Sequence, residues 1–274
     1  MTSLARRASW QQRSAAAALP ILIVVVGALA RDLRPVALVA LMAGAVISFV
    51  RDEDARWLWA ACLPVSVNLA WGLLPTPLAD PRGDDCGNPL SPPAVWRVAE
   101  AVLVLAATVI IAWRLREKRA DIRLRAPSRI VIAAAGAAFV VFGPLGLLLG
   151  ATLAAPFFGS FALDVGQVGA VVPALLFAVS NGTMEEIVYR GACMTWAARV
   201  VGLLPAVALQ AVLFGLAHGG PDFVGNPAPV MLAMSAGAVV AAAIAIRTRS
   251  LLLPIAAHVA LDLPLYYYFA CRAA

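Results

Sequence analysis

Three apolar stretches of the sequence, where charged side chains are costly, carry six residues that could do chemistry: Glu185, Glu186, Arg190, His218, His258 and Asp262. A charge at the centre of a bilayer costs roughly 2.5–3.5 kcal/mol on insertion scales. Such residues persist there when they pair, face a polar cavity or take part in chemistry. A carboxylate and an imidazole around a water molecule form a general-base site, in which one group removes a proton and donors stabilise an oxyanion. These residue types therefore predict hydrolytic chemistry.

The spacing within the apolar stretches predicts which of these groups meet. Glu186 and Arg190 are four residues apart and share a helix face, so they can form an ion pair. Glu185 points about 100° away and is free for another partner. His258 and Asp262 have the same spacing, so the carboxylate can orient the imidazole. The alternative is purely structural: both glutamates satisfy Arg190, and the His258–Asp262 pair only stabilises a helix bundle.

Depth along the helices links the three stretches. Counted from flanking arginines or turns at a rise of 1.5 Å per residue, Glu185 lies about 20 Å deep and His218 about 22 Å. The same estimate places His258 at about 13 Å and Asp262 at about 19 Å. Taken alone, His218 is as easily a hydrogen-bonding residue between helices as a catalytic group. The common depth favours one shared site.

The same groups could bind Zn²⁺ with an open position for water. The sequence contains no HExxH motif, which disfavours the usual zinc-protease arrangement, and it contains no GxSG-like serine nucleophile. We therefore expect no cofactor, with zinc as the alternative and its ligands unknown.

The four cysteines, Cys62, Cys86, Cys193 and Cys271, lack CxxC spacing, so a zinc or redox motif is not expected. Cys86 and Cys271 both fall on the predicted outer side of the membrane and could pair. We expect unpaired thiols.

The elements that position these residues must be membrane helices. Of 274 residues, 62% are hydrophobic and 13% are charged, and the mean hydropathy is +0.88, whereas a soluble domain carries about a quarter charged residues. The composition predicts an all-α, polytopic transmembrane helix bundle of about 8–9 spans. Nine apolar segments are evident, at about 15–30, 35–50, 57–74, 95–113, 130–154, 167–189, 204–218, 228–246 and 251–269.

The formal net charge of +6 follows the loops that alternate with these segments. Most basic residues fall on one side, which predicts a cytoplasmic N-terminus and argues against a nucleic-acid partner. We expect the membrane to be the plasma membrane of a bacterium. Arg6, Arg7 and Arg13 precede an apolar run without a small-residue cleavage site, so we expect a first membrane helix rather than a removed signal peptide. The basic run at 114–129 is expected to face lipid headgroups, with a specific anionic-lipid or partner site as the alternative.

The three polar stretches together resemble the CPBP family, the CAAX-processing and bacteriocin-processing (Abi) intramembrane proteases. The resemblance covers roughly residues 165–270 and includes a helix of small residues at 235–245. It rests on three motifs: EExxxR at Glu185, Glu186 and Arg190, FxxxH at Phe214 and His218, and HxxxN/D at His258 and Asp262.

The resemblance implies hydrolysis of peptide bonds in substrates that are embedded in or anchored to the membrane. Glu185 would activate the water molecule, helped by His218. His258 and Asp262 would stabilise the oxyanion. The resemblance also implies a division of the chain into N-terminal membrane helices with a basic cytoplasmic linker, at 1–130, and a catalytic membrane core at 131–274.

In the same resemblance, Glu186 and Arg190 support the catalytic groups. Two positions depart from the family pattern. Tyr189 stands where phenylalanine is common, and Asp262 stands where many members have asparagine. The extra negative charge beside His258 favours an imidazolium or a bound metal, so both glutamate and metal mechanisms stay open.

Two other classes of function fit an intramembrane Glu/His cluster. A transporter or proton relay would use the same residue types, but such proteins often carry corresponding broken helices in two halves, and no internal repeat is evident. A catalytically idle immunity or scaffold protein would not need Glu185, His218 and His258 together.

Overall fold

The structure is entirely helical in the residues that it describes, and it contains no strand there. It is a computed structural model that describes residues 18–51, 55–74, 86–88, 90–118, 121–125, 127–158, 166, 168–219 and 226–271. The predicted all-α class is confirmed.

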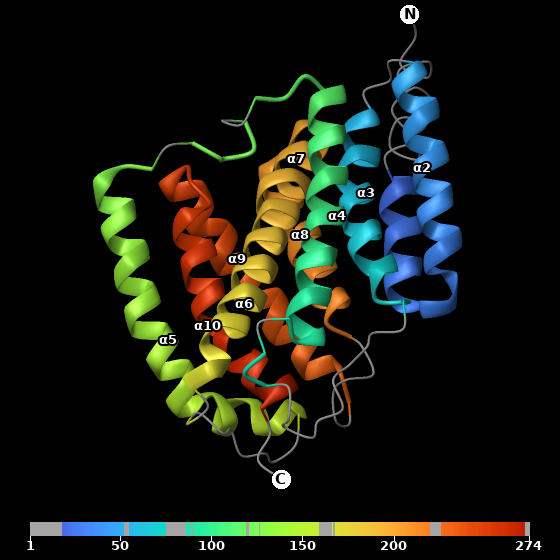
Figure 1. Ribbon diagram of the computed structural model, residues 1–274. Coiled ribbons are helices and arrows are strands. Elements are labelled where there is room, and N and C mark those ends of the chain that lie inside the picture. Colours follow the sequence, from blue (N-terminus) through green and yellow to red (C-terminus); the bar gives the residue numbers. More distant parts are fainter. Residues whose placement is uncertain are drawn as a thin grey trace, which may run out of the picture.

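The helices follow the apolar segments of the sequence in number and order (Figure 1). Their bounds are Ala18–Leu29 for the first helix, then η1 Arg31–Leu33, α2 Arg34–Val50, α3 Arg56–Trp71, α4 Pro92–Arg114, α5 Arg129–Phe158, η2 Val168–Ala170, α6 Val171–Glu185, η3 Glu186–Cys193, α7 Met194–Val201, α8 Leu203–Ala217, α9 Ala228–Thr248 and α10 Leu252–Ala270.

The largest departure from the predicted segments concerns the sixth, 167–189, because its helix continues to Val201. Gly202 ends this long helix with a φ of 85°, a conformation that suits glycine. Arg249 ends α9 in the left-handed region with a φ of 53°. The long helix therefore carries α6, η3 and α7 on one axis through the centre of the bundle (Figure 1).

Length and composition allow five of the described helices to cross a bilayer: Arg31–Val50, Pro92–Arg114, Arg129–Leu149, Val168–Val201 and Ala228–Thr248. Shorter apolar helices accompany them at Ala18–Leu29, Leu203–Ala217 and Leu252–Tyr267. Large apolar side chains are exposed along these helices; Val140, Leu148 and Leu232, for example, are 69%, 77% and 71% exposed. Such exposure fits a lipid-facing surface.

The helices of the N-terminal half pack directly on the helix that carries the glutamates. The first helix and α2 form one edge of the bundle and α5 forms the opposite edge (Figure 1). Between them, α4 packs on α6 and α3 packs on α7, while α10 lies between α5 and α6. The polar residues of α6, η3 and α10 are therefore enclosed by helices from both halves of the chain.

The structure corrects the expectation of unpaired thiols, because Cys86 and Cys271 form a disulfide bond. Their Cα atoms lie 5.2 Å apart, and both side chains are buried. The hydroxyl of Tyr266 donates a hydrogen bond to the carbonyl oxygen of Cys86 (2.9 Å) and can accept one from the hydroxyl of Ser91 (2.8 Å). These bonds hold the segment before α4 against the end of α10, which brings together two cysteines 185 residues apart.

This pairing predicts the number of free thiols in the purified protein. Alkylation in denaturant without reductant should modify two cysteines, Cys62 and Cys193, whereas alkylation after reduction should modify all four. Intact-mass measurement distinguishes the two results. Modification of four cysteines without reductant would contradict the disulfide.

Candidate active site

The glutamates lie where the central helix changes from α-helical to π-helical. Glu185 is the last residue of α6, and Glu186 is the first residue of the π-helical segment η3. Such segments occur frequently at functional sites. Gly191, within this segment, lets another part of the chain approach, because a Cβ atom there would lie 3.2 Å from the carbonyl oxygen of Ile122. The sequence analysis did not predict this local change of helix type.

The carboxylate of Glu186 joins two helices. Its Oε1 atom lies 3.3 Å from Nη1 of Arg190, so the structure contains the ion pair that the spacing suggested. The same oxygen accepts a hydrogen bond from Nδ1 of His258 on α10, at 2.9 Å. Glu186 and Arg190 are only 1% and 2% exposed. A buried charge requires such partners, so this contact fixes α10 against the central helix.

The other ring nitrogen of His258 faces two further carboxylates. Nε2 lies 3.4 Å from Oε2 of Glu185 and 3.7 Å from Oδ2 of Asp262. Both distances exceed a normal N–H···O hydrogen bond. Asp262 is held from its other side, because the amide of Asn181 donates a hydrogen bond to its Oδ2 atom at 2.9 Å. Asn181 precedes Glu185 by four residues on the same helix face, a spacing that could have revealed it.

His218 lies at the end of α8, beside this cluster but outside its ion pairs. Its Nδ1 atom lies 2.7 Å from the carbonyl oxygen of Phe214, and the two rings are 4.6 Å apart. The ring of Phe214 also receives the guanidinium of Arg190, at 4.2 Å from the ring centroid. Among the described residues no ion pair within 4 Å joins His218 to a carboxylate, although electrostatic interactions link it to Glu185 and His258.

Five of the six predicted residues thus form one connected group, and the sixth, His218, adjoins it through Phe214. The connected residues are Glu185, Glu186, Arg190, His258 and Asp262. Among the described residues, no group of three or more His, Cys, Asp and Glu side chains has an arrangement that could hold a metal ion.

A second buried polar network connects the site to the N-terminal half. The hydroxyl of Tyr189 in η3 donates to Oδ1 of Asn68 on α3, at 3.2 Å. The amide of Asn68 donates to Oε1 of Glu100 on α4, at 2.8 Å, and Arg97 pairs with the other oxygen of Glu100 at 2.6 Å. Sequence reasoning did not single out this network. A glutamate within the apolar segment 95–113 was the signal that could have found it.

Gly182 allows α6 and α10 to approach each other at the level of the site. A Cβ atom at Gly182 would lie 3.1 Å from the backbone nitrogen of Val259 and 3.4 Å from Cβ of His258. Any larger residue would therefore push α10 outward. The position of the His258 ring depends on this close backbone contact.

The fold and the site together define a helical membrane protein with a buried carboxylate–imidazole centre, the kind of centre that hydrolases use. Residues 167–264 match the sequence model of the Rce1-like family, described as type II CAAX prenyl endopeptidase Rce1-like. This segment contains all six candidate residues, and the match confirms the family resemblance that the motifs indicated. The family supports an intramembrane protease activity in general terms. No curated protein and no solved structure matches the chain.

Substitution of Gly182 tests the close approach of the two helices. Gly182→Ala should lower the free energy of unfolding by about 1–3 kcal/mol, because the new methyl group overpacks the contact with α10. Gly136→Ala on α5 is the matched control, since a Cβ atom there meets nothing within 4 Å. That variant should keep or raise the stability, because alanine is the better helix former by about 1 kcal/mol. Equal effects of the two substitutions on unfolding in detergent would contradict the close contact.

A double-mutant cycle tests the network at Tyr189. Tyr189→Phe removes the donor to Asn68, and Asn68→Leu removes the amide that bonds both Tyr189 and Glu100. Each substitution should lower the free energy of unfolding by about 1–3 kcal/mol. The double variant should lose less stability than the sum of the two single losses, with a coupling free energy of about 1 kcal/mol. Tyr267→Phe, which loses a hydroxyl outside this network, should change the stability little. Additive losses at Tyr189 and Asn68 would show that the two residues do not interact.

Proposed function

We propose that the chain is an intramembrane endopeptidase that hydrolyses peptide bonds with a glutamate-activated water molecule. One observation carries this proposal. The Oε2 atom of Glu185 is buried and has no hydrogen-bond partner among the described residues, whereas Glu186 and Asp262 each accept a hydrogen bond through one oxygen. A buried carboxylate oxygen needs a hydrogen-bond donor. A substrate water molecule bound beside Glu185 would supply one.

His218 is suited to assist Glu185. A carbonyl oxygen only accepts hydrogen bonds, so the 2.7 Å contact with Phe214 makes Nδ1 of His218 the donor. In the neutral imidazole, Nε2 is then an acceptor. A water molecule between Glu185 and His218 would thus meet two acceptors, which orient it and draw away its proton.

His258 is suited to stabilise the oxyanion. Its Nδ1 atom is held by Glu186, which is itself held by Arg190, so the ring has a fixed orientation. In the protonated ring, Nε2 also carries a hydrogen, and it lies too far from Glu185 and Asp262 for a strong direct hydrogen bond, so this N–H would be available to a substrate oxygen. Asp262 would favour a protonated ring while the negative charge develops.

The proposed reaction needs no covalent intermediate. Glu185 removes one proton from water, and the resulting hydroxide attacks the peptide carbonyl carbon. The tetrahedral oxyanion accepts a hydrogen bond from His258. The C–N bond then breaks as protonated Glu185 returns its proton to the leaving nitrogen, which gives a carboxylate and an amine and restores the enzyme.

The substrate class follows from the membrane setting and from the description of the matched family. Since that description names a CAAX prenyl endopeptidase, a prenylated CAAX tail is the first substrate to test. Bacteriocin leader peptides and membrane-anchored signalling proteins are the alternatives. The arginine-rich ends of the helices would face the cytoplasm of a bacterial cell, with the disulfide on the outer side.

Cleavage by the purified protein in lipid vesicles tests the mechanism. Glu185→Gln should reduce kcat/KM by roughly 10²–10⁴-fold, because glutamine cannot accept the proton. Glu117→Gln is the matched control, since Glu117 pairs with Arg199 near the helix ends, outside the site. His218→Ala should also reduce the rate, with correct folding checked by the melting temperature.

Cleavage of the candidate peptide at the wild-type rate by Glu185→Gln would contradict the glutamate mechanism. A parallel assay with a chelator decides the role of a metal. Loss of activity that zinc restores would move the protein to the metal-dependent class.

A further inference from the structure

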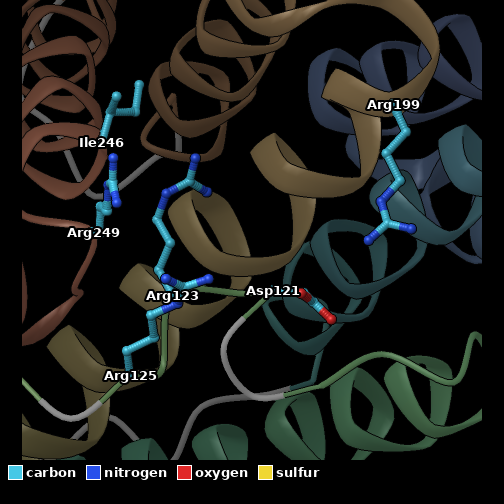
Figure 2. Close-up of a pocket in the computed structure, with 6 residues that line it drawn as sticks. All are labelled: Asp121, Arg123, Arg125, Arg199, Ile246 and Arg249. Atoms are coloured by element: carbon cyan, nitrogen blue, oxygen red, sulfur yellow. The ribbon is translucent and has the colours of Figure 1, made fainter.

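A cavity of about 400 Å³ lies at the arginine-rich end of the bundle, and none of the six candidate residues lines it. Its walls come from the linker between α4 and α5, from the end of α7 and from the turn between α9 and α10. The lining residues are Asp121, Arg123, Arg125, Arg199, Ile246 and Arg249 (Figure 2). The cavity is therefore a separate feature that the protease mechanism does not use.

The lining of this cavity is strongly basic. Four arginines face one aspartate, which leaves a formal charge of +3. Figure 2 shows Arg123, Arg125 and Arg249 grouped on one side and Arg199 across from them. Asp121 already accepts a hydrogen bond from the backbone of Lys118, at 2.9 Å. Guanidinium groups from separate segments that line one cavity suit a phosphate group, which accepts several charge-assisted hydrogen bonds.

Two of these arginines hold an unfavourable backbone conformation. Among the described residues, the only non-glycine positions with positive φ are Arg116, Arg123 and Arg249, at 55°, 61° and 53°. Two of the three line the cavity. Side chains with a Cβ atom adopt this region at a cost, and such strain concentrates at functional sites. A glycine would fit these positions better, so the arginine side chains need another reason to be there.

The contacts of Arg123 and Arg199 fix these two side chains without using all their donors. Nη1 of Arg123 donates to the hydroxyl of Thr195 at 2.5 Å and to the carbonyl oxygen of Arg190 at 3.4 Å. Nη2 of Arg199 pairs with Glu117 at 2.7 Å, and its guanidinium lies 4.0 Å from the ring centroid of Trp57. Each of these two guanidinium groups has five N–H donors, so donors remain for a ligand.

The location selects a lipid as the source of the phosphate. The cavity opens at the ends of membrane helices, the level at which phospholipid headgroups lie. Its volume is within the range of small-ligand sites. We propose that this cavity binds the phosphate headgroup of an anionic phospholipid from the adjoining leaflet. Because Arg123 also contacts the backbone of Arg190, the headgroup would brace the helix that carries the catalytic glutamates.

Binding of defined lipids to the full-length protein in neutral detergent tests this site. Native mass spectrometry would measure the affinity for dioleoyl phosphatidic acid and for dioleoyl phosphatidylcholine. In a third measurement, inorganic phosphate alone is added and the melting temperature of the protein is recorded. Wild-type protein should bind phosphatidic acid at least tenfold more tightly than phosphatidylcholine, and free phosphate should not reproduce the effect.

The positive φ of Arg249 supplies a variant that should still fold. Arg249→Gly should weaken the binding of phosphatidic acid roughly fivefold, the effect of about one basic side chain at a membrane surface. Without lipid, its melting temperature should equal or exceed that of wild type, because glycine suits this conformation. Arg116→Gly is the matched control, with the same backbone change outside the cavity, and it should bind as wild type does.

Three results would overturn the proposal. Equal affinity for the two lipids would show that the headgroup charge is not recognised. If Arg249→Gly and Arg116→Gly weaken the binding of phosphatidic acid equally, the lipid is attracted by diffuse surface charge rather than bound at a site. Stabilisation by free phosphate without retention of phosphatidic acid would assign the cavity to a soluble anion. Each readout is independent of proteolysis, so it stands apart from the proposed activity.

Discussion

The rest of the site depends on the interaction of the Glu186 carboxylate with Arg190 and His258. This carboxylate is buried among apolar helices, where a charge is stable only with partners. Arg190 supplies one partner from the same helix, and His258 supplies the other from α10. The close approach at Gly182 lets α10 reach this position. The shared oxygen atom and the close contact at Gly182 together place the His258 ring relative to Glu185.

The N-terminal helices, which lie outside the family match, contact the site through Tyr189. The hydroxyl that distinguishes this residue from phenylalanine has a partner in Asn68, and Asn68 is held by Glu100. The tyrosine at position 189 and the buried Asn68 and Glu100 are therefore explained together, as members of one hydrogen-bonded network. The division of the chain near residue 130 stays a prediction.

The sequence predicted the features that depend on local periodicity. The lengths of the apolar segments predicted the helices, and the four-residue spacing predicted the Glu186–Arg190 ion pair. Contacts between distant segments could not be predicted. The bond from His258 to Glu186, the Cys86–Cys271 disulfide and the π-helical turn each depend on how the helices pack. Depth estimates likewise separated His258 from Glu185 by more than a helical turn, whereas the two side chains lie 3.4 Å apart.

A kinetic double-mutant cycle on Glu186 and His258 tests the central interaction most directly. The values of kcat/KM would be compared for wild type, Glu186→Gln, His258→Gln and the double variant on one membrane-anchored peptide. Residues that act as a unit have non-additive effects. The double variant should therefore be about as slow as the slower single variant. If the fold-reduction in kcat/KM of the double variant equals the product of the two single reductions, the two residues do not share a function.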